Sequence, residues 1–279
     1  MDITIANGLK LEYESHGPED GEAVLLIMGL GGQLTLWPMG FVDLLVQRGF
    51  RVIRYDARDV GLSEKVDGAY TLDDMAADAA GLLDALGIGA AHIVGGSMGG
   101  MVAQLVAINH PEHVRTLTSI MSTTGNPELP NSSPELIERL STRPPDPAED
   151  LDAFLDHQVA NMQLTQSPAY PTDPQVLRAQ ISRDFNRSYY PAGALQQQIA
   201  TVGAPDRRTG LRALNVPTLV IHGEADLVIA PAGGRDTAEN VPNARLLLIP
   251  GMGHDLPPQL FQQFADAIAE LASADERSR

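Results

Sequence analysis

Short apolar runs alternate with amphipathic stretches along most of the chain. The runs predict strands at residues 23–28, 52–55, 91–95, 114–121, 216–221 and 245–249. Apolar residues at helical spacing predict helices at residues 38–48, 72–86, 101–109, 231–240 and 257–271. Continuously apolar strands are typical of sheets that are buried on both faces. The alternation therefore predicts an α/β fold, with a mostly parallel, twisted sheet covered by helices on both faces.

The two ends of the chain depart from this pattern. Residues 3–5 and 9–13 read as short strands around Asn7-Gly8, a pair that favours a tight hairpin turn. Residues 272–279 follow the last apolar helical position, and we expect them to form a frayed tail.

The pattern also breaks between residues 125 and 210. Prolines interrupt short helical pieces there, and no long apolar strand appears before Val216. We expect a helical cap at residues 125–210, inserted into a core made of residues 1–124 and 211–279. A separate helical domain is the alternative. The insertion is favoured because the alternation of strands and helices resumes after it.

Composition narrows the class of protein and its partners. Hydrophobic residues make up 43% of the chain and charged residues 20%, as in ordinary soluble globular proteins. The formal net charge is 19 − 36 = −17, which disfavours nucleic acid and anionic membranes as partners. The sequence has no cysteine, which excludes disulfides, thiolate catalysis and cysteine-bound zinc. Residues 1–17 lack the basic and apolar regions of a signal peptide, so a cytoplasmic location is expected by default.

One glycine-rich turn carries a lone serine. The sequence Gly95-Gly96-Ser97-Met98-Gly99 joins a predicted strand to the helix expected from Met101. This G-x-S-x-G arrangement is typical of a nucleophile elbow, a strained turn that exposes a serine hydroxyl. The pentapeptide alone is also compatible with a structural turn or a phosphate-binding turn. Ser97 is the candidate nucleophile.

Two further strand ends supply the groups that a serine nucleophile needs. A serine hydroxyl becomes reactive when an oriented base removes its proton. Asp226 follows one predicted strand, and His254 lies in a glycine-rich loop after the next. Because parallel strands end at the same edge of a sheet, we expect Ser97, Asp226 and His254 to meet there. Glu224, in the same loop as Asp226, is the alternative orienting acid.

Other polar residues near this edge receive structural interpretations. His222 ends a predicted strand and is interpreted as a structural histidine. Asp255, next to the candidate base, is interpreted as a solvated or helix-capping residue. Asp56, Arg58 and Asp59 follow another strand and are interpreted as a structural knot of ion pairs and hydrogen bonds.

Two backbone N–H groups are candidates for an oxyanion hole, which needs donors where negative charge develops. Met98 follows the nucleophile directly, and Leu30 lies in a glycine-rich loop after the strand at residues 23–28.

The candidate substrate-pocket residues were chosen for their position and apolar size. They lie in or near this loop, next to the nucleophile, or in the cap. They are Met28, Gly29, Leu30, Trp37, Met98, Phe154, Met162, Tyr189 and Tyr190. This chemistry implies no metal and no organic cofactor.

Together these stretches resemble the α/β-hydrolase superfamily over nearly the whole chain, in the family's order of serine, aspartate and histidine. The resemblance implies an α/β-hydrolase fold with Ser97 as nucleophile, Asp226 as acid, His254 as base and the cap at residues 125–210. Within the superfamily, four stretches are similar to the aclacinomycin methylesterase-like serine esterases of actinobacteria. These stretches are residues 27–29, 55–63, 216–221 and 249–254.

Two positions depart from the wider family pattern. Many members have histidine where this chain has Met28, and many have glycine where it has Asp59. Met28 cannot make the side-chain hydrogen bond that would stiffen the loop containing Leu30. At both positions the residue found here is similar to that of the methylesterase subgroup.

The resemblance implies a serine carboxylic-ester hydrolase that acts on a small-molecule ester through an acyl-enzyme intermediate. Perhydrolases and C–C bond hydrolases keep the same triad and remain alternatives. Haloalkane dehalogenases and epoxide hydrolases use an aspartate nucleophile, which Ser97 is not. A non-catalytic ligand-binding homologue with an intact triad is the alternative from another class.

Overall fold

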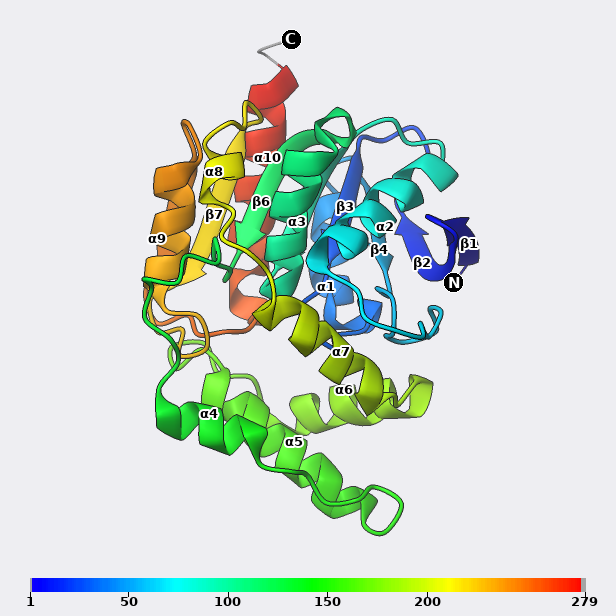
Figure 1. The fold of residues 1–279 in the computed structure, drawn as a ribbon, viewed down its shortest axis with the longest axis vertical. Helices are drawn as coiled ribbons and strands as arrows, with labels where there is room; N and C mark the ends of the chain where they lie inside the picture. The colour runs from blue at the N-terminus through cyan, green and yellow to red at the C-terminus, as the bar shows by residue number, and fades with distance from the viewer. Residues whose placement is uncertain (1, 277–279) are drawn as a thin grey trace.

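One twisted sheet organises residues 2–276, the part of the chain that the computed structural model describes. Its eight strands lie in the order β1-β2-β4-β3-β5-β6-β7-β8 (Figure 1). They are β1 Asp2–Ala6, β2 Leu9–His16, β3 Ala23–Ile27, β4 Arg51–Tyr55, β5 Ala91–Gly96, β6 Val114–Ile120, β7 Thr218–Gly223 and β8 Arg245–Ile249. The β1–β2 and β2–β4 pairs are antiparallel, and every other pair is parallel. The predicted fold class is confirmed.

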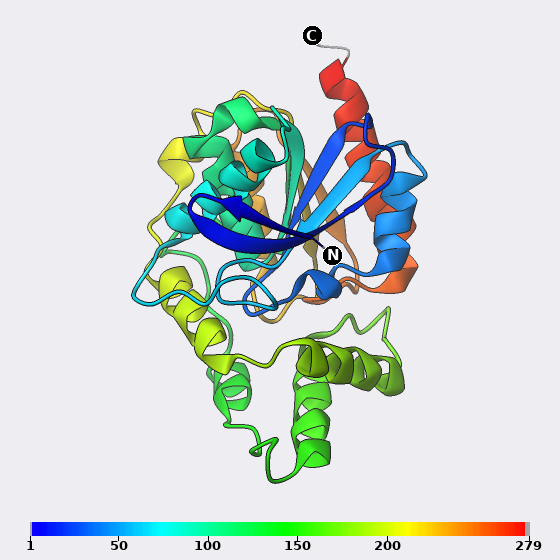
Figure 2. The ribbon, with the colours of Figure 1, turned by 90° about the vertical axis from the view of Figure 1, so that its right-hand side faces the viewer.

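Helices cover both faces of this sheet. α1 and α10 lie on one face, and α2, α3, α8 and α9 lie on the other (Figures 1 and 2). The helices of the two layers are α1 Met39–Val46, α2 Leu72–Ala85, α3 Met98–Asn109, α8 Arg208–Leu211, α9 Pro231–Asn240 and α10 Phe261–Glu276. Three 3-10 turns, Leu34–Leu36, Pro111–His113 and Pro258–Leu260, complete the regular structure of the two layers.

Strand β3 shows why a strand between two helical layers is apolar at every position. Val24 and Leu26 pack in the cluster under α1 and α10, whereas Leu25 and Ile27 pack in the cluster under α2 and α3. All four side chains are fully buried. Side chains of a strand alternate between its faces, so a strand between two helical layers needs apolar residues at every position. Each such burial contributes about 1.5–3 kcal/mol.

The first hairpin also follows its sequence signal. Asn7 and Gly8, between β1 and β2, have φ angles of 49° and 80°. Two consecutive positive φ angles are what a two-residue turn needs to match the twist of its strands. Asparagine and glycine adopt this conformation at the least cost, so the predicted turn is confirmed.

Of the five helices between β6 and β7, the first four lie beyond one edge of the sheet, as Figures 1 and 2 show. They are α4 Pro134–Ser141, α5 Leu151–Thr165, α6 Pro174–Arg187 and α7 Pro191–Val202, and we call residues 134–202 the cap. Proline is the first residue of α4, α6 and α7. At that position its missing N–H costs nothing and its fixed φ suits the helix. Three of the prolines that interrupt the sequence pattern therefore begin helices, and others lie in the loops between them.

Two helices, α3 and α10, depart most from their expected bounds. α3 begins at Met98, directly after Ser97, rather than at Met101. α10 continues to Glu276, so the expected frayed tail is wrong for residues 272–276. Leu271 and Ala272 remain buried in the cluster under α1 and α10, which holds the last turns of this helix on the core. Residues 277–279 of that expected tail lie outside the described residues. Among residues 2–276 no helix is long and apolar enough to cross a membrane.

Candidate active site

The turn between β5 and α3 holds Ser97 in a strained conformation. Its φ is 54° and its ψ is −122°, values that a residue with a side chain rarely adopts. A Cβ on Gly95 would lie 2.1 Å from the carbonyl oxygen of Gly99, and a Cβ on Gly99 would lie 2.1 Å from that of Ile27. Both outer glycines of the motif are therefore required by close backbone contacts. The turn presents the Ser97 hydroxyl at the carboxyl end of β5.

Three side chains from distant loops meet at this turn. The Nε2 of His254 lies 2.9 Å from Ser97 Oγ, and its Nδ1 lies 2.7 Å from Asp226 Oδ2. A carboxylate can only accept a hydrogen bond, so Nδ1 carries the imidazole proton and Nε2 accepts from the serine hydroxyl. This is the hydrogen-bonded order that an activated serine nucleophile needs.

Asp226 is held as a carboxylate. Its Oδ1 accepts hydrogen bonds from the backbone N–H groups of Val228 at 2.8 Å and Ile229 at 2.9 Å. Burial raises the pKa of this carboxyl, but bonds from His222, His254 and the Ile229 N–H outweigh it and set the pKa to about 2. The side chain is therefore ionised at neutral pH and can orient His254.

His222 lies closer to this machinery than its structural interpretation implied. Its Nε2 donates to the carbonyl oxygen of Ile229 at 2.9 Å and lies 3.4 Å from Asp226 Oδ2. The ring is completely buried. His222 thus supports both the carboxylate and the loop that carries it. A histidine four residues before the candidate acid was the only sequence signal for this contact.

The other two acids of these loops lie elsewhere. The carboxylate of Glu224 is half exposed and faces Arg235 at 3.9 Å, so Glu224 makes no contact with His254. Asp255 was expected to be solvated or to cap a helix, and this expectation is wrong. Its carboxylate accepts hydrogen bonds from the hydroxyl and the N–H of Ser167 in the cap. Burial raises the pKa of Asp255. The residue therefore joins the loop of His254 to the cap.

The loop after β3 lies directly over the serine. A Cβ on Gly29 would lie 3.1 Å from Ser97 Cβ, so this glycine leaves room for the nucleophile. The next residue is Leu30, whose side chain is 41% exposed. Among residues 2–276, the N–H groups of Leu30 and Met98 have no hydrogen-bond acceptor. The N–H groups of Leu30 and Met98 thus remain the predicted oxyanion donors.

Four of the expected pocket residues are buried: Met28, Trp37, Met98 and Phe154. Trp37 is fully buried, and its ring stacks on Phe41 with centroids 5.8 Å apart. Phe154 is 2% exposed and packs with Phe185 inside the cap. Met28 belongs to the same core cluster as Trp37. Trp37 thus offers no surface to a substrate in this conformation, and Phe154 almost none.

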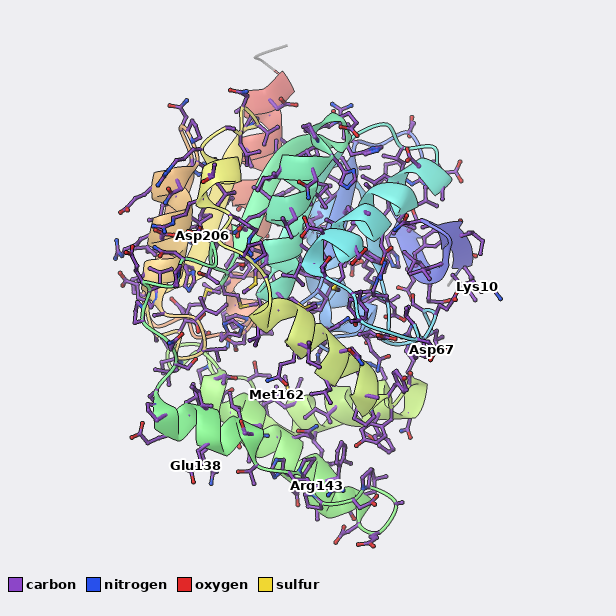
Figure 3. All side chains as sticks on the ribbon, in the orientation of Figure 1. Lys10, Asp67, Glu138, Arg143, Met162 and Asp206 are labelled. Atoms are coloured by element: carbon purple, nitrogen blue, oxygen red, sulfur yellow. The ribbon has the colours of Figure 1, made fainter. Side chains whose placement is uncertain are left out.

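The remaining cap candidates have exposed surface. Tyr189 is 44% exposed and Tyr190 is 40% exposed, with Lys65 Nζ 5.4 Å from the Tyr190 ring centroid. Met162, on α5, is half-buried. In Figure 3 it lies between α5 and the core, whereas Glu138 and Arg143 lie on the outer side of the cap. Met162 is thus a cap candidate on the side of the cap that faces the core.

A cavity of about 280 Å³ lies at the junction between the core and the segments that lead into and out of the cap. Thr123, Leu129, Arg207, Val228 and Ile229 are among its lining residues. Neither the triad nor any expected pocket residue lines it. The cavity adjoins the Asp226 loop through Val228 and Ile229 and is separate from the hydroxyl of Ser97.

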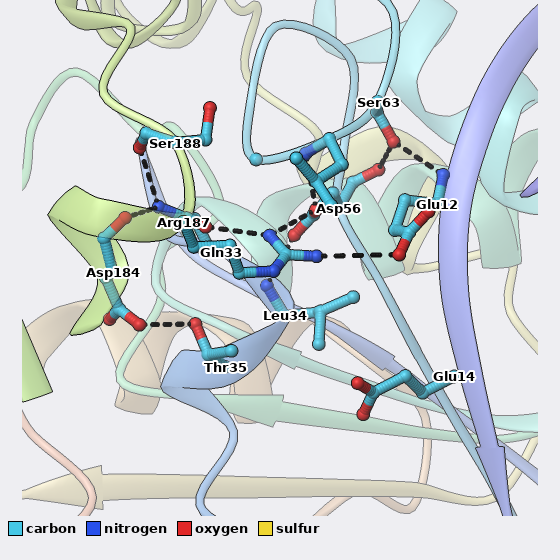
Figure 4. A network of polar contacts seen from close by, with 12 residues as sticks. Glu12, Glu14, Gln33, Leu34, Thr35, Asp56, Ser63, Asp184, Arg187 and Ser188 are labelled. Atoms are coloured by element: carbon cyan, nitrogen blue, oxygen red, sulfur yellow. Dashed lines mark hydrogen bonds and ion pairs between the residues drawn. The ribbon is translucent and has the colours of Figure 1, made fainter. Parts of the chain in front are cut away.

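Asp56 joins the cap to the loop after β3, as Figure 4 shows. This carboxylate is fully buried and accepts from the Leu34 N–H at 2.8 Å and the Leu62 N–H at 2.8 Å. Arg187, the last residue of α6, donates to Asp56 at 2.7 Å and to the side-chain oxygen of Gln33 at 2.7 Å. The structural interpretation of Asp56 was right but incomplete, because its cation comes from the cap.

Neighbouring acids in this network respond to burial. Burial raises the pKa of Glu12, although the Arg187 guanidinium, 3.9 Å away, works against that rise. Burial also raises the pKa of Asp184, which accepts from the Thr35 hydroxyl at 2.7 Å. Arg187 is therefore the cation that two buried acids, Asp56 and Glu12, share.

No group of three or more histidine, aspartate and glutamate side chains is placed to hold a metal ion within residues 2–276. The polar side chains around Ser97 are instead paired with one another or with backbone groups. The arrangement can support nucleophilic attack by a serine, proton transfer by a histidine and stabilisation of an oxyanion.

Comparisons with known proteins identify the family and agree with the fold. A family model described as alpha/beta hydrolase fold matches residues 22–258. Rhodomycin D methylesterase of Streptomyces peucetius is 32% identical, over 91% of this chain and 92% of its own. The solved enol-lactonase of Burkholderia xenovorans LB400 has a TM-score of 0.75 at 25% identity, covering 99% of this chain and 100% of its own. A thermophilic esterase of Thermogutta terrifontis has a TM-score of 0.75 at 26% identity, covering 98% of each chain.

The likeness to the methylesterase bears out the resemblance noted in the sequence. Relatives with other names, including a non-heme haloperoxidase of Rhodococcus erythropolis at 29% identity, span about nine tenths of both chains. The chain therefore belongs to the α/β-hydrolase fold family and is an enzyme of the hydrolase class.

Proposed function

We propose that this enzyme is a serine carboxylic-ester hydrolase that works through an acyl-enzyme intermediate. The observation that carries the proposal is the chain of hydrogen bonds from Ser97 Oγ through His254 to Asp226, at 2.9 and 2.7 Å. The strained turn at Ser97 supports it, because such strain persists where the surrounding structure imposes it, often at reactive groups. The alternative acid, Glu224, lies outside this chain of contacts.

In the acylation step, His254 Nε2 takes the proton of the Ser97 hydroxyl as its oxygen attacks the ester carbonyl carbon. The carbonyl oxygen becomes an oxyanion, which the N–H groups of Leu30 and Met98 receive. Asp226 stabilises the imidazolium that forms. His254 then protonates the leaving alcohol, and the acyl group stays on Ser97.

In the deacylation step, the neutral imidazole removes a proton from water, which attacks the acyl carbon. The second tetrahedral intermediate uses the same two N–H donors. Its collapse releases the carboxylic acid, and His254 returns the proton to Ser97. The ester and one water molecule are the only reactants that the two steps need to balance.

The proposed substrate is a small carboxylic ester, with a methyl ester favoured by the methylesterase relatives. Leu30 is an exposed apolar residue of the loop over Ser97, and the half-buried Met162 lies between α5 and the core. Apolar walls with a few polar groups favour an uncharged acyl group of apolar bulk. The same triad also suits perhydrolysis and C–C bond hydrolysis, so the assay must separate these reactions.

The test compares wild type with Ser97→Ala on a panel of methyl, p-nitrophenyl and lactone esters. We expect Ser97→Ala to lose at least about 10⁴-fold in kcat, because the nucleophile is gone. Ser273→Ala, a matched change on the exposed side of α10, should keep full activity. Unchanged turnover in Ser97→Ala would rule the mechanism out. Turnover of vinylogous diketones or peracid formation that exceeds ester hydrolysis would reassign the reaction.

A further inference from the structure

The loop after β3, residues 29–34, is held mainly by the cap. The Gly31 N–H donates to Gln197 Oε1 on α7 at 2.7 Å. The Gln33 side chain donates to the carbonyl oxygens of Asp184 at 2.7 Å and Ser188 at 2.9 Å, both at the end of α6. Within the loop itself, the Gly32 N–H bonds the carbonyl oxygen of Gly29 at 3.0 Å. The shape of this loop therefore depends on where α6 and α7 sit.

Gln197 is the part of the cap that bonds the loop closest to Ser97. Its side chain is fully buried, and both ends of its amide are used. The oxygen accepts from Gly31, and the Nε2 donates to the carbonyl oxygen of Arg58 at 3.0 Å. These opposite requirements fix which end of the amide faces the loop. A buried side chain with both groups bonded is a rigid support.

The contacts on either side of Leu30 confine its peptide group. Gly29 lies against Ser97, and Gly31, with a φ of 66°, lies under α7, where a Cβ would meet Ala194 Cβ at 3.2 Å. Glycine is the residue with the most backbone freedom, so a loop with three glycines needs external support to hold one orientation. Met28 supplies no side-chain hydrogen bond to this loop. The cap provides the support instead.

We propose that Gln197 is a positioning residue for the reaction, because its bond to Gly31 fixes the Leu30 N–H as an oxyanion donor. The cap is then a structural part of the oxyanion hole as well as a cover for the site. This inference rests on the proposed ester hydrolase function. Donors must point to the oxyanion before the reaction to be effective, so a loosened loop loses transition-state stabilisation.

The test measures kcat and KM of Gln197→Met, which keeps a similar size but loses both hydrogen bonds. Removing an oxyanion donor outright typically costs roughly 10²–10³-fold in kcat, so a loosened donor should cost about 10- to 100-fold. KM should change by less than about 3-fold, because the loop acts mainly in the transition state. Gln198→Met, one residue along the same helix and exposed, is the matched control and should keep wild-type kcat.

Two more measurements separate positioning from a general effect on the cap. Gln197→Glu keeps an acceptor for the Gly31 N–H and should retain at least about ten times the kcat of Gln197→Met. A trifluoromethyl ketone, which forms an oxyanion on Ser97, should bind Gln197→Met more weakly in proportion to the loss in kcat/KM. The matching alcohol, which forms no oxyanion, should bind equally well. Circular dichroism checks that the variants are folded.

These measurements test the positioning role of Gln197 separately from the proposed ester hydrolase function. A kcat for Gln197→Met within about 2-fold of wild type, or a rise in KM alone, would overturn the positioning role. Equal weakening of the ketone and the alcohol would do the same, because it reports a changed pocket. In those cases Ser97→Ala would still abolish activity, so the proposed function would stand. Unchanged activity in Ser97→Ala would overturn the proposed function and this inference together.

Discussion

The two sides of the candidate site are held by different parts of the protein. Ser97 and Met98 lie between β5 and α3, and the Ser97 N–H bonds the carbonyl oxygen of Ile120 in β6 at 2.9 Å. On the other side, the loop that contains Leu30 bonds mainly to α6 and α7 of the cap. The nucleophile side is therefore held by the sheet, whereas the loop that contains Leu30 is held by hydrogen bonds to the cap.

The pKa values of acids on the two sides shift in opposite directions. Hydrogen bonds keep the pKa of Asp226 low, at about 2, despite its burial. Burial raises the pKa of Glu12 and of Asp184, which lie in the network that binds the cap. The sheet side thus favours the ionised form of its carboxylate, and on the cap side Asp56 and Glu12 share one arginine. Changes to each side should have distinct consequences.

The largest expected effect is on the sheet side. Asp226→Asn should lower kcat by about 10⁴-fold, because an amide in this position favours the wrong imidazole tautomer. Steady-state kinetics on the best ester of the panel measures this loss. The expected loss exceeds that for Gln197→Met because the imidazole of His254 could then no longer accept the proton of Ser97.

The control for this change is Glu224→Gln, in the same loop. Its carboxylate is half exposed and faces Arg235, so we expect kcat to stay near the wild-type value. If Glu224→Gln caused the large loss and Asp226→Asn did not, the orienting acid would be Glu224, and the geometry around His254 would have to change in solution.

The next effect concerns the attachment of the cap. Arg187→Met should lower the free energy of unfolding by about 3–5 kcal/mol, because it leaves the buried carboxylate of Asp56 without its cation. Glu12 would lose the same guanidinium. Urea denaturation followed by tryptophan fluorescence at neutral pH measures the change.

A second arginine on α6 provides the comparison for this loss. Arg178 forms ion pairs with Asp152 and Asp156 on the exposed surface of α5. Arg178→Met should change the free energy of unfolding by less than about 1 kcal/mol, as is usual for surface pairs. Equal effects of Arg178→Met and Arg187→Met would mean that the cap is not held by the buried network.

The same contrast explains what could be predicted from the sequence. The serine turn and the strands before Asp226 and His254 have local signals: an apolar run, then glycine, then a chemical group. The edge of a parallel sheet then brings the three groups together. None of these signals depends on the cap. The meeting of all three side chains at one edge of the sheet could therefore be predicted from the sequence.

The contacts of the cap have no such signal. Gln197 and Gly31 are 166 residues apart, and Arg187 and Asp56 are 131 residues apart. Gln197 is the middle of three consecutive glutamines, and only the packing of α7 decides which one turns inward. Asp255 was misinterpreted for the same reason, since its partner Ser167 comes from the cap. Pairings between layers depend on docking geometry, which periodicity does not encode.

The smallest expected effect is a response to acid on the sheet side. The pKa of Asp226 is about 2 in the folded protein and about 3.9 in an unfolded chain. The unfolded state therefore binds a proton first as the pH falls. The stability from this carboxylate, about 2–3 kcal/mol, is fully present above about pH 5 and is lost as the pH falls through 4 toward 2.

Comparison of wild type with Asp226→Asn isolates this carboxylate from the other acids. The difference in their free energies of unfolding should shrink by about 1 kcal/mol between pH 5.5 and pH 3, because only the wild type has the group that titrates. Urea denaturation at both pH values measures it. A difference that is constant or grows on acidification would mean that Asp226 is not held ionised by its neighbours. The sheet side would then resemble the cap side, and the contrast between them would fail.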